Sequence, residues 1–127
     1  MAADEKRLYP RLALEIEDGY FGQFRLANDD RLAALIVNLS AGGINIAVAE
    51  SASDRIKNGD ILNLQNISGG TSFSFLKNLR AEIRWIKKLE IPGYVSVGCR
   101  FIDISDDLRE QLSRFVRSER MTRGQYD

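Results

Sequence analysis

The chain of 127 residues contains no histidine, and this absence excludes several common kinds of active site. Without an imidazole, neither a Ser-His-Asp nor a Cys-His nucleophile can be assembled, and no HExxH zinc site can form. The side chain that moves protons most readily near pH 7 is missing as well. Carboxylates are numerous, but no pair of them stands in a context that suggests general acid–base catalysis. We therefore expect a protein that is not an enzyme.

Cysteine and long apolar stretches are also scarce. The single cysteine, Cys99, can form neither a disulfide within the chain nor a CxxC metal or redox motif. The longest apolar run, Leu32–Val37, is far shorter than the ~20 residues that cross a bilayer. The segment Met1–Arg7 lacks the apolar stretch of a signal peptide. These features favour a cytoplasmic protein that uses no metal or other cofactor and does not insert into membranes.

The chain carries no net charge, because 18 basic residues balance 18 acidic ones. A neutral chain has no bulk attraction for nucleic-acid polymers or for anionic membranes. Any binding of an anion must therefore come from a local cluster of basic side chains.

The sequence does contain repeated alternation of apolar and polar residues with a period of two, which is typical of half-buried strands. Turn residues such as those of Asn28–Asp30 and Ser68–Gly70 separate the alternating runs. A polar stretch over residues 50–60, with one helical turn near Asp54–Lys57, interrupts them once. The expected strands cover Leu12–Ile16, Phe24–Leu26, Arg31–Leu39, Ile44–Val48, Ile61–Ile67, Ser72–Trp85 and Tyr94–Phe101.

The period changes near the end of the chain, where apolar residues at i, i+4, i+7 and i+8 indicate one amphipathic helix. Ser105 is expected to cap the N-terminus of this helix, and Asp106 and Asp107 complement its dipole. The apolar stripe consists of Leu108, Leu112, Phe115 and Val116.

Several short strands followed by one helix predict a mostly β protein, namely a small antiparallel barrel with the helix over one opening. We expect a flexible N-terminal arm over residues 1–11, the barrel and helix over 12–118, and a flexible tail over 119–127. Inside the barrel, Trp85 and Phe73 follow the strand alternation and are expected in the core. An alternative for Trp85 is contact with a ligand at the rim of the barrel. Arg84 is expected to be solvated.

A first candidate for binding chemistry is the basic arm, in which Arg7 and Arg11 lie on either side of Pro10 and follow Lys6. Pro10 disfavours a helix interior and favours extended backbone, in which residues four apart lie on the same side. Two guanidinium groups held in this way can grip phosphates or stack on aromatic rings. A solvated arm with weak surface ion pairs is the alternative that the residues alone leave open.

A second candidate is the loop at residues 38–43, between two expected strands. Asn38 and Ser40 alternate to the same side, and both can donate and accept hydrogen bonds. Gly42 and Gly43 permit close approach of the backbone and are expected to leave amides free to cradle an anion. The alternative is a plain hairpin loop, in which Asn38 and Ser40 bond their own backbone.

Together, Arg7-xxx-Arg11 and Asn38-x-Ser40-xx-Gly43 resemble the signature of the PilZ domain, a family of bacterial receptors for the second messenger cyclic di-GMP. Ala81–Trp85 resembles the late core strand of this family, and Val97–Ile104 resembles its Gly-x-x-Phe strand before the closing helix. The resemblance covers nearly the whole chain. It implies a six-stranded antiparallel β-barrel with a C-terminal α-helix.

The resemblance also implies roles for single residues. The arm is expected to wrap cyclic di-GMP against the barrel, so that its arginines contact phosphates and guanines, while the loop holds the ligand from the barrel side. Asn38 stands where Asp is commoner in the family and lacks the charge with which Asp accepts guanine N–H groups. Lys6 stands where a basic residue often accompanies the binding of two intercalated ligand molecules. The expected ligand-binding residues are Lys6, Arg7, Arg11, Asn38, Ser40, Gly42 and Gly43.

Three classes of function remain to be separated. The expected one is a receptor whose arm is ordered by cyclic di-GMP and which signals to an unidentified protein effector in motility, pilus, exopolysaccharide or virulence regulation. The second is a PilZ-fold adaptor for protein contacts that does not depend on the nucleotide; such relatives usually lack the two motifs present here. The third is a small nucleic-acid-binding barrel, but its basic, aromatic strand face is not visible in the sequence.

Overall fold

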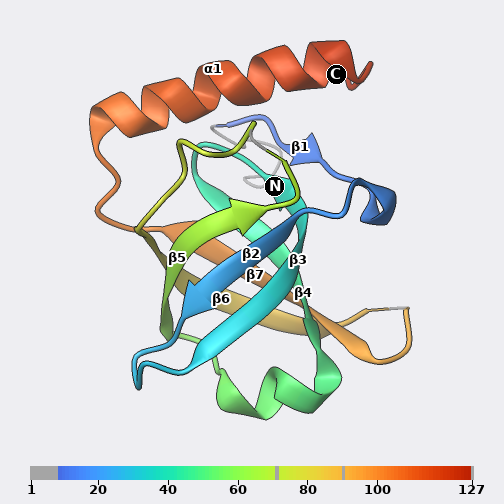
Figure 1. Ribbon diagram of the computed structural model, residues 1–127, viewed down its shortest axis with the longest axis vertical. Coiled ribbons are helices and arrows are strands. Elements are labelled where there is room, and N and C mark those ends of the chain that lie inside the picture. The colour runs from blue at the N-terminus through green and yellow to red at the C-terminus, as the bar shows by residue number, and fades with distance from the viewer. Residues whose placement is uncertain (1–8, 71, 90, 127) are drawn as a thin grey trace, which may run out of the picture.

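Six antiparallel strands close on themselves to form a barrel (Figure 1). The computed structural model describes residues 9–70, 72–89 and 91–126. The strands pair in the order β3, β2, β5, β6, β7 and β4, and a pairing of β3 with β4 completes the circle. A two-residue strand, β1 (Leu12–Ala13), pairs with the last two residues of β3, beyond the stretch that pairs with β2. The barrel strands are β2 (Phe21–Arg25), β3 (Arg31–Leu39), β4 (Gly43–Ala49), β5 (Ile61–Ser68), β6 (Leu79–Lys88) and β7 (Tyr94–Phe101).

The alternation of side chains decides which residues fill the barrel. In β7, every second residue from Val95 to Phe101 is buried, and in β5 Leu62 and Leu64 are fully buried. Such alternation places one face of each strand in the core and leaves the other face for solvent or for a binding site. The strands expected at Arg31–Leu39 and Tyr94–Phe101 are confirmed with these bounds.

The two ends of the barrel are covered differently, as Figure 1 shows. Helix α1 (Asp106–Thr122) lies across one end and buries Leu112 and Val116 against the core. The 3-10 helix η3 (Glu50–Arg55) lies at the other end. The N-cap expected for α1 is confirmed, because the Leu108 N–H donates to Ser105 Oγ at 3.1 Å.

The strand expected over Ser72–Trp85 is wrong in its first half. Strand β6 begins at Leu79, and the described residues before it form turns. Phe73 alternates with Phe75 as strand residues do, but its ring packs edge-on against Tyr20 and Phe115 at centroid distances of 4.6 and 5.0 Å. The apolar side chains of this segment therefore serve the contact between barrel and helix.

The strand expected over Leu12–Ile16 is also shorter than predicted. Ile16 is 57% exposed and begins the 3-10 helix η2 (Ile16–Asp18). The Glu15 N–H donates to the Asp18 carboxylate at 2.8 Å, and Gly19 ends the turn at a φ of 68°. A side-chain cap and a left-handed glycine thus outcompete the strand pattern locally.

Helix α1 continues to Thr122, so residues 119–122 are helical where a tail was expected from 119. The helix ends in a Schellman arrangement: the Gly124 N–H donates to the Met121 carbonyl and the Gln125 N–H to the Arg120 carbonyl. Gly124 has a φ of 70°, which glycine adopts without steric cost. The chain therefore turns back toward the barrel instead of leaving it.

Replacing Phe73 by alanine should lower the free energy of unfolding by about 3–5 kcal/mol, because the ring is 1% exposed and joins barrel to helix. Phe75→Ala serves as the control, since Phe75 is only partly buried and should cost less. Urea denaturation followed by circular dichroism measures both values. Equal losses for the two variants would contradict the assignment of Phe73 as the anchor.

Candidate ligand-binding site

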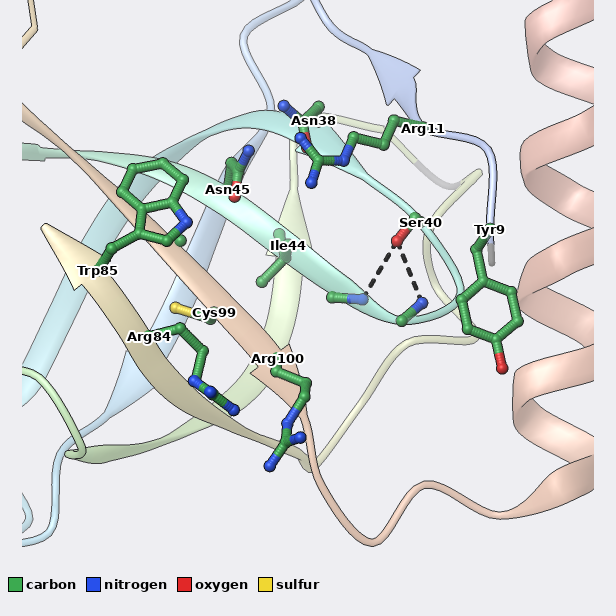
Figure 2. A pocket seen from close by; sticks show the side chains of 13 residues that line it. Tyr9, Arg11, Asn38, Ser40, Ile44, Asn45, Arg84, Trp85, Cys99 and Arg100 are labelled. Carbon is green, nitrogen blue, oxygen red and sulfur yellow. Dashed lines mark hydrogen bonds between the residues drawn. The ribbon is translucent and has the colours of Figure 1, made fainter. Parts of the chain in front are cut away.

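A pocket of about 320 Å³ opens on the outer wall of the barrel, over strands β3, β4, β7 and β6 (Figure 2). Its volume lies within the range of small-molecule sites. None of the described residues that line it is acidic. The lining consists of Tyr9, Arg11, Asn38, Ser40, Gly42, Gly43, Ile44, Asn45, Arg84, Trp85, Gly98, Cys99 and Arg100.

Two bulges determine which side chains face this pocket. The register of β3 with β4 shifts between Ile36 and Asn38, and that of β6 with β7 shifts between Ile83 and Trp85. An extra residue on one strand moves the residues that follow it to the other face. As a result, one lateral row of cross-strand partners runs over the outer wall. The row consists of Asn38, Asn45, Gly98 and Trp85.

Trp85 is the last residue of this row. The prediction that its side chain lies in the core is wrong. The indole lies directly over Gly98, where a Cβ would collide with the ring, and the Lys87 ammonium is 4.9 Å from the ring centroid. The side chain is half-buried and lines the pocket. The structure thus places Trp85 on the outer wall beside the pocket, because of the bulge after Ile83, and its contact with a ligand stays a prediction.

The loop between β3 and β4 is held together by Ser40. Its Oγ accepts hydrogen bonds from the N–H groups of Gly42 and Gly43 at 3.1 and 3.2 Å, and its own N–H donates to the Gly43 carbonyl. The expectation that these two amides are free to cradle an anion is therefore wrong. A short side chain next to a turn satisfies the turn's own backbone first. The Ser40 hydroxyl still has its proton to donate toward the pocket.

Space requires glycine at position 43 of this loop and favours it at position 42. A Cβ on Gly43 would collide with the Cys99 carbonyl of the neighbouring strand β7, and one on Gly42 would lie 2.9 Å from the Tyr9 ring. Tyr9 belongs to the segment just before β1 and packs against the core. The absence of a side chain at Gly42 thus lets the N-terminal segment lie against the loop.

Three guanidinium groups line the pocket: those of Arg11, Arg84 and Arg100. The Glu82 carboxylate lies 3.3 Å from Arg100 and 3.9 Å from Arg84, which keeps these two side chains together on the β6–β7 side. Arg11 comes from the opposite side, next to Asn38 (Figure 2). The cations therefore face one another across the pocket, an arrangement that favours an anion with more than one charge.

The structure brings five of the seven expected ligand-binding residues into this one pocket. Lys6 and Arg7 lie outside the described residues. The sequence reasoning missed Tyr9, Asn45 and the basic pair of β6 and β7, and it assigned Arg84 to solvent. Outward alternation of Arg84 and Arg100 on expected strands was visible in the sequence, but the pairing that places them side by side was not. The residues brought together are Arg11, Asn38, Ser40, Gly42 and Gly43.

Cys99 is one of the residues that line the pocket, and it is only 7% exposed. Burial raises the pKa of its thiol to about 12, since a thiolate would lose its solvation there. The described residues contain no cluster of three or more side chains suited to hold a metal ion. In the same part of the chain, no helix is both long enough and apolar enough to cross a bilayer.

Comparison with protein families gives a match to the PilZ domain over residues 5–118. The chain belongs to the PilZ family. The match spans the barrel, most of α1 and the segment that carries Arg7 and Arg11. No curated protein matches the chain.

Solved PilZ structures share the fold. The PilZ domain of YcgR from Escherichia coli, solved with c-di-GMP, has a TM-score of 0.72 at 22% identity, over 94% of this chain and 96% of that one. The MrkH–c-di-GMP complex of K. pneumonia has a TM-score of 0.73 at 15% identity, over 94% of this chain and 54% of that one. The Bacillus subtilis inhibitor of motility (MotI/DgrA) has a TM-score of 0.69 at 18% identity, over 91% of this chain and 52% of that one. This chain thus spans nearly all of the first structure and about half the length of the other two.

The raised pKa of Cys99 predicts that its thiol reacts slowly with alkylating reagents. At pH 8 the folded protein should react with iodoacetamide far more slowly than the chain unfolded in urea, because alkylation requires the thiolate and burial disfavours it. Mass spectrometry of timed samples measures both rates. Alkylation of the folded protein as fast as that of the unfolded chain would contradict the prediction.

Proposed function

We propose that this protein is a receptor for cyclic di-GMP and that the pocket over strands β3, β4, β7 and β6 is the binding site. The observation that carries the proposal is the convergence of two distant motifs. Arg11 from the N-terminal segment and the Asn38–Gly43 loop line the same pocket, although 26 residues lie between Arg11 and Asn38 in the sequence. Other PilZ proteins of this fold have been solved with this nucleotide.

The chemistry of the pocket suits a nucleotide with two phosphates and two purine rings. Guanidinium groups bind phosphate oxygens with two parallel hydrogen bonds and also stack on aromatic planes. The three arginines of the pocket supply a local positive charge that the neutral chain as a whole lacks. The half-buried indole of Trp85, which lines the pocket, offers a ring on which one base can stack, a contact worth about 1–3 kcal/mol in proteins that bind single-stranded nucleic acid.

Each part of the site receives a role in this proposal. Arg11 contacts a phosphate or guanine from the N-terminal side, and the side chains of Asn38 and Asn45 meet base edges with amide donors and acceptors. Ser40 shapes the loop and donates its hydroxyl proton. Arg84 and Arg100 face the phosphates from the β6–β7 side. Lys6 and Arg7, which lie outside the described residues, complete the arm.

We further propose that the ligand orders the charged residues that precede Tyr9, and that a protein effector recognises the changed surface. The support is compositional, because four of the first seven residues are charged and this segment cannot bury enough apolar surface to fix itself. In such a segment, contacts with a bound ligand can offset the conformational entropy that is lost when the segment becomes ordered. The protein then acts as a switch and performs no chemistry of its own.

Titration calorimetry with cyclic di-GMP, with GTP and with a short oligonucleotide tests the proposed function. We expect saturable binding of cyclic di-GMP and much weaker binding of the other two. Arg11→Ala should weaken binding about tenfold or more, since a charge-assisted hydrogen bond contributes about 1.5–3 kcal/mol. Arg84→Ala should weaken it in the same direction.

Arg114→Ala is the matched control for these variants. It removes the same charge from the exposed face of α1, where Arg114 pairs with Glu110 at 3.1 Å, and it should leave the affinity unchanged. Absence of heat with every ligand would favour a nucleotide-independent adaptor. Preference for the oligonucleotide would favour a nucleic-acid-binding barrel, and either result would overturn the proposal.

A further inference from the structure

The segment that carries Arg11 contacts helix α1 before Arg11, and it contacts the turn that follows the helix after Arg11. Before it, the Tyr9 ring centroid lies 6.0 Å from Arg109 Cζ of the helix. After it, the Gln125 side chain forms two hydrogen bonds with the backbone of Ala13, one to its carbonyl and one from its N–H, each at 2.9 Å. Arg11 therefore lies between two contacts, one with helix α1 and one with the turn that ends it.

The two bonds from Gln125 complete the short strand β1. One side of β1 pairs with β3, so that Ala13 stands opposite Asn38 in the pocket row. The other side would present an unpaired N–H and C=O, as any edge strand does. The carboxamide of Gln125 satisfies both groups, as the backbone of a neighbouring strand would. A strand of only two residues has little stability of its own and depends on such a partner.

The backbone of Gln125 is itself anchored to Arg120 of α1 by two hydrogen bonds. Its N–H donates to the Arg120 carbonyl at 2.7 Å, and its carbonyl accepts from Arg120 Nε at 3.0 Å. Beside it, Arg123 pairs with Asp18 of η2 at 3.0 Å. The pKa of Asp18 lies below its ordinary value, first because of the hydrogen bond from the Glu15 N–H and then because of the one from Arg123. The contact between η2 and the end of α1 is thus a charged one at neutral pH.

We propose that Gln125 is a positioning residue of the ligand site: by fixing β1 against β3, it holds Arg11 beside Asn38 in the orientation that binds the nucleotide. This inference rests on the proposed function. Gln125 does not line the pocket, so it acts through Ala13 and Arg11 rather than through contact with the ligand. Pre-organisation of this kind raises affinity because less backbone freedom is lost on binding.

A double-mutant cycle tests the proposal in the full chain. The cycle compares Arg11→Ala, Gln125→Ala and the double variant by calorimetric titration with cyclic di-GMP. We expect Gln125→Ala alone to weaken binding at least about threefold, and to have almost no further effect when Arg11 is already absent. A purely structural role would give the same loss with and without Arg11. Gln111→Ala, which removes an exposed glutamine of α1, is the control and should change nothing.

Amide exchange of the unliganded variants gives a second readout. In Gln125→Ala the Ala13 amide should exchange faster than in the unchanged chain, while the amides of β6 and β7 keep their protection. Unchanged affinity in Gln125→Ala, or equal losses in both backgrounds, would overturn this inference and leave the proposed receptor function standing. Absence of binding by the unchanged chain would instead overturn the proposed function, and the inference with it.

Discussion

The pairing of β3 with β4 is the interaction on which the rest of the structure depends. It closes the sheet into a barrel, and its bulge on β3 places Asn38 opposite Asn45 on the outer wall. Closure removes the exposed edges that an open sheet would present. The same pairing forms the loop in which Ser40 binds two backbone amides. Core and candidate site are thus built by one set of backbone hydrogen bonds, and a change of register would disturb both.

The electrostatics of the site follow from the neutrality of the chain. With no net charge to attract an anion from a distance, the affinity must come from guanidinium groups that meet at short range. Glu82 lies beside the arginines of β6 and β7 and limits their mutual repulsion without lining the pocket. Exposed ion pairs of this kind add little to the free energy of unfolding. Their effect is to keep the side chains of Arg84 and Arg100 close together at the pocket.

Much of the fold could be predicted from local patterns. The alternation in Arg31–Leu39 and Tyr94–Phe101, and the serine before the amphipathic stripe, report interactions that act within a few residues. The features that were mispredicted depend on contacts between distant segments. Phe73 alternates like a strand residue but packs on Phe115 of the helix, and no local pattern distinguishes the two. Gly124 is a local signal for the end of the helix that the sequence analysis did not use, and the contact of the next residue, Gln125, with Ala13 was not visible in the sequence.

In the candidate site too, some residues could be predicted from local patterns and others depend on contacts between distant segments. Its two motifs could be found because they are short and their spacing is distinctive, and the structure brings their described residues together. The position of Trp85 could not be predicted, because a bulge of one residue reverses the face of every side chain after it. The pairing of Arg84 with Arg100 likewise depends on the register of two strands. Sequence patterns therefore identified the N-terminal and loop sides of the pocket, and strand register determined the remaining side.

The central claim is that an N-terminal segment and a distant loop hold one nucleotide between them. Hydrogen exchange over the whole chain, measured with and without cyclic di-GMP, tests this claim most directly. The account predicts that residues 1–13 and 38–45 both gain protection on binding, while β2 and β5 on the opposite wall stay unchanged. Protection confined to that wall, or equal exchange of both segments in the two states, would contradict it.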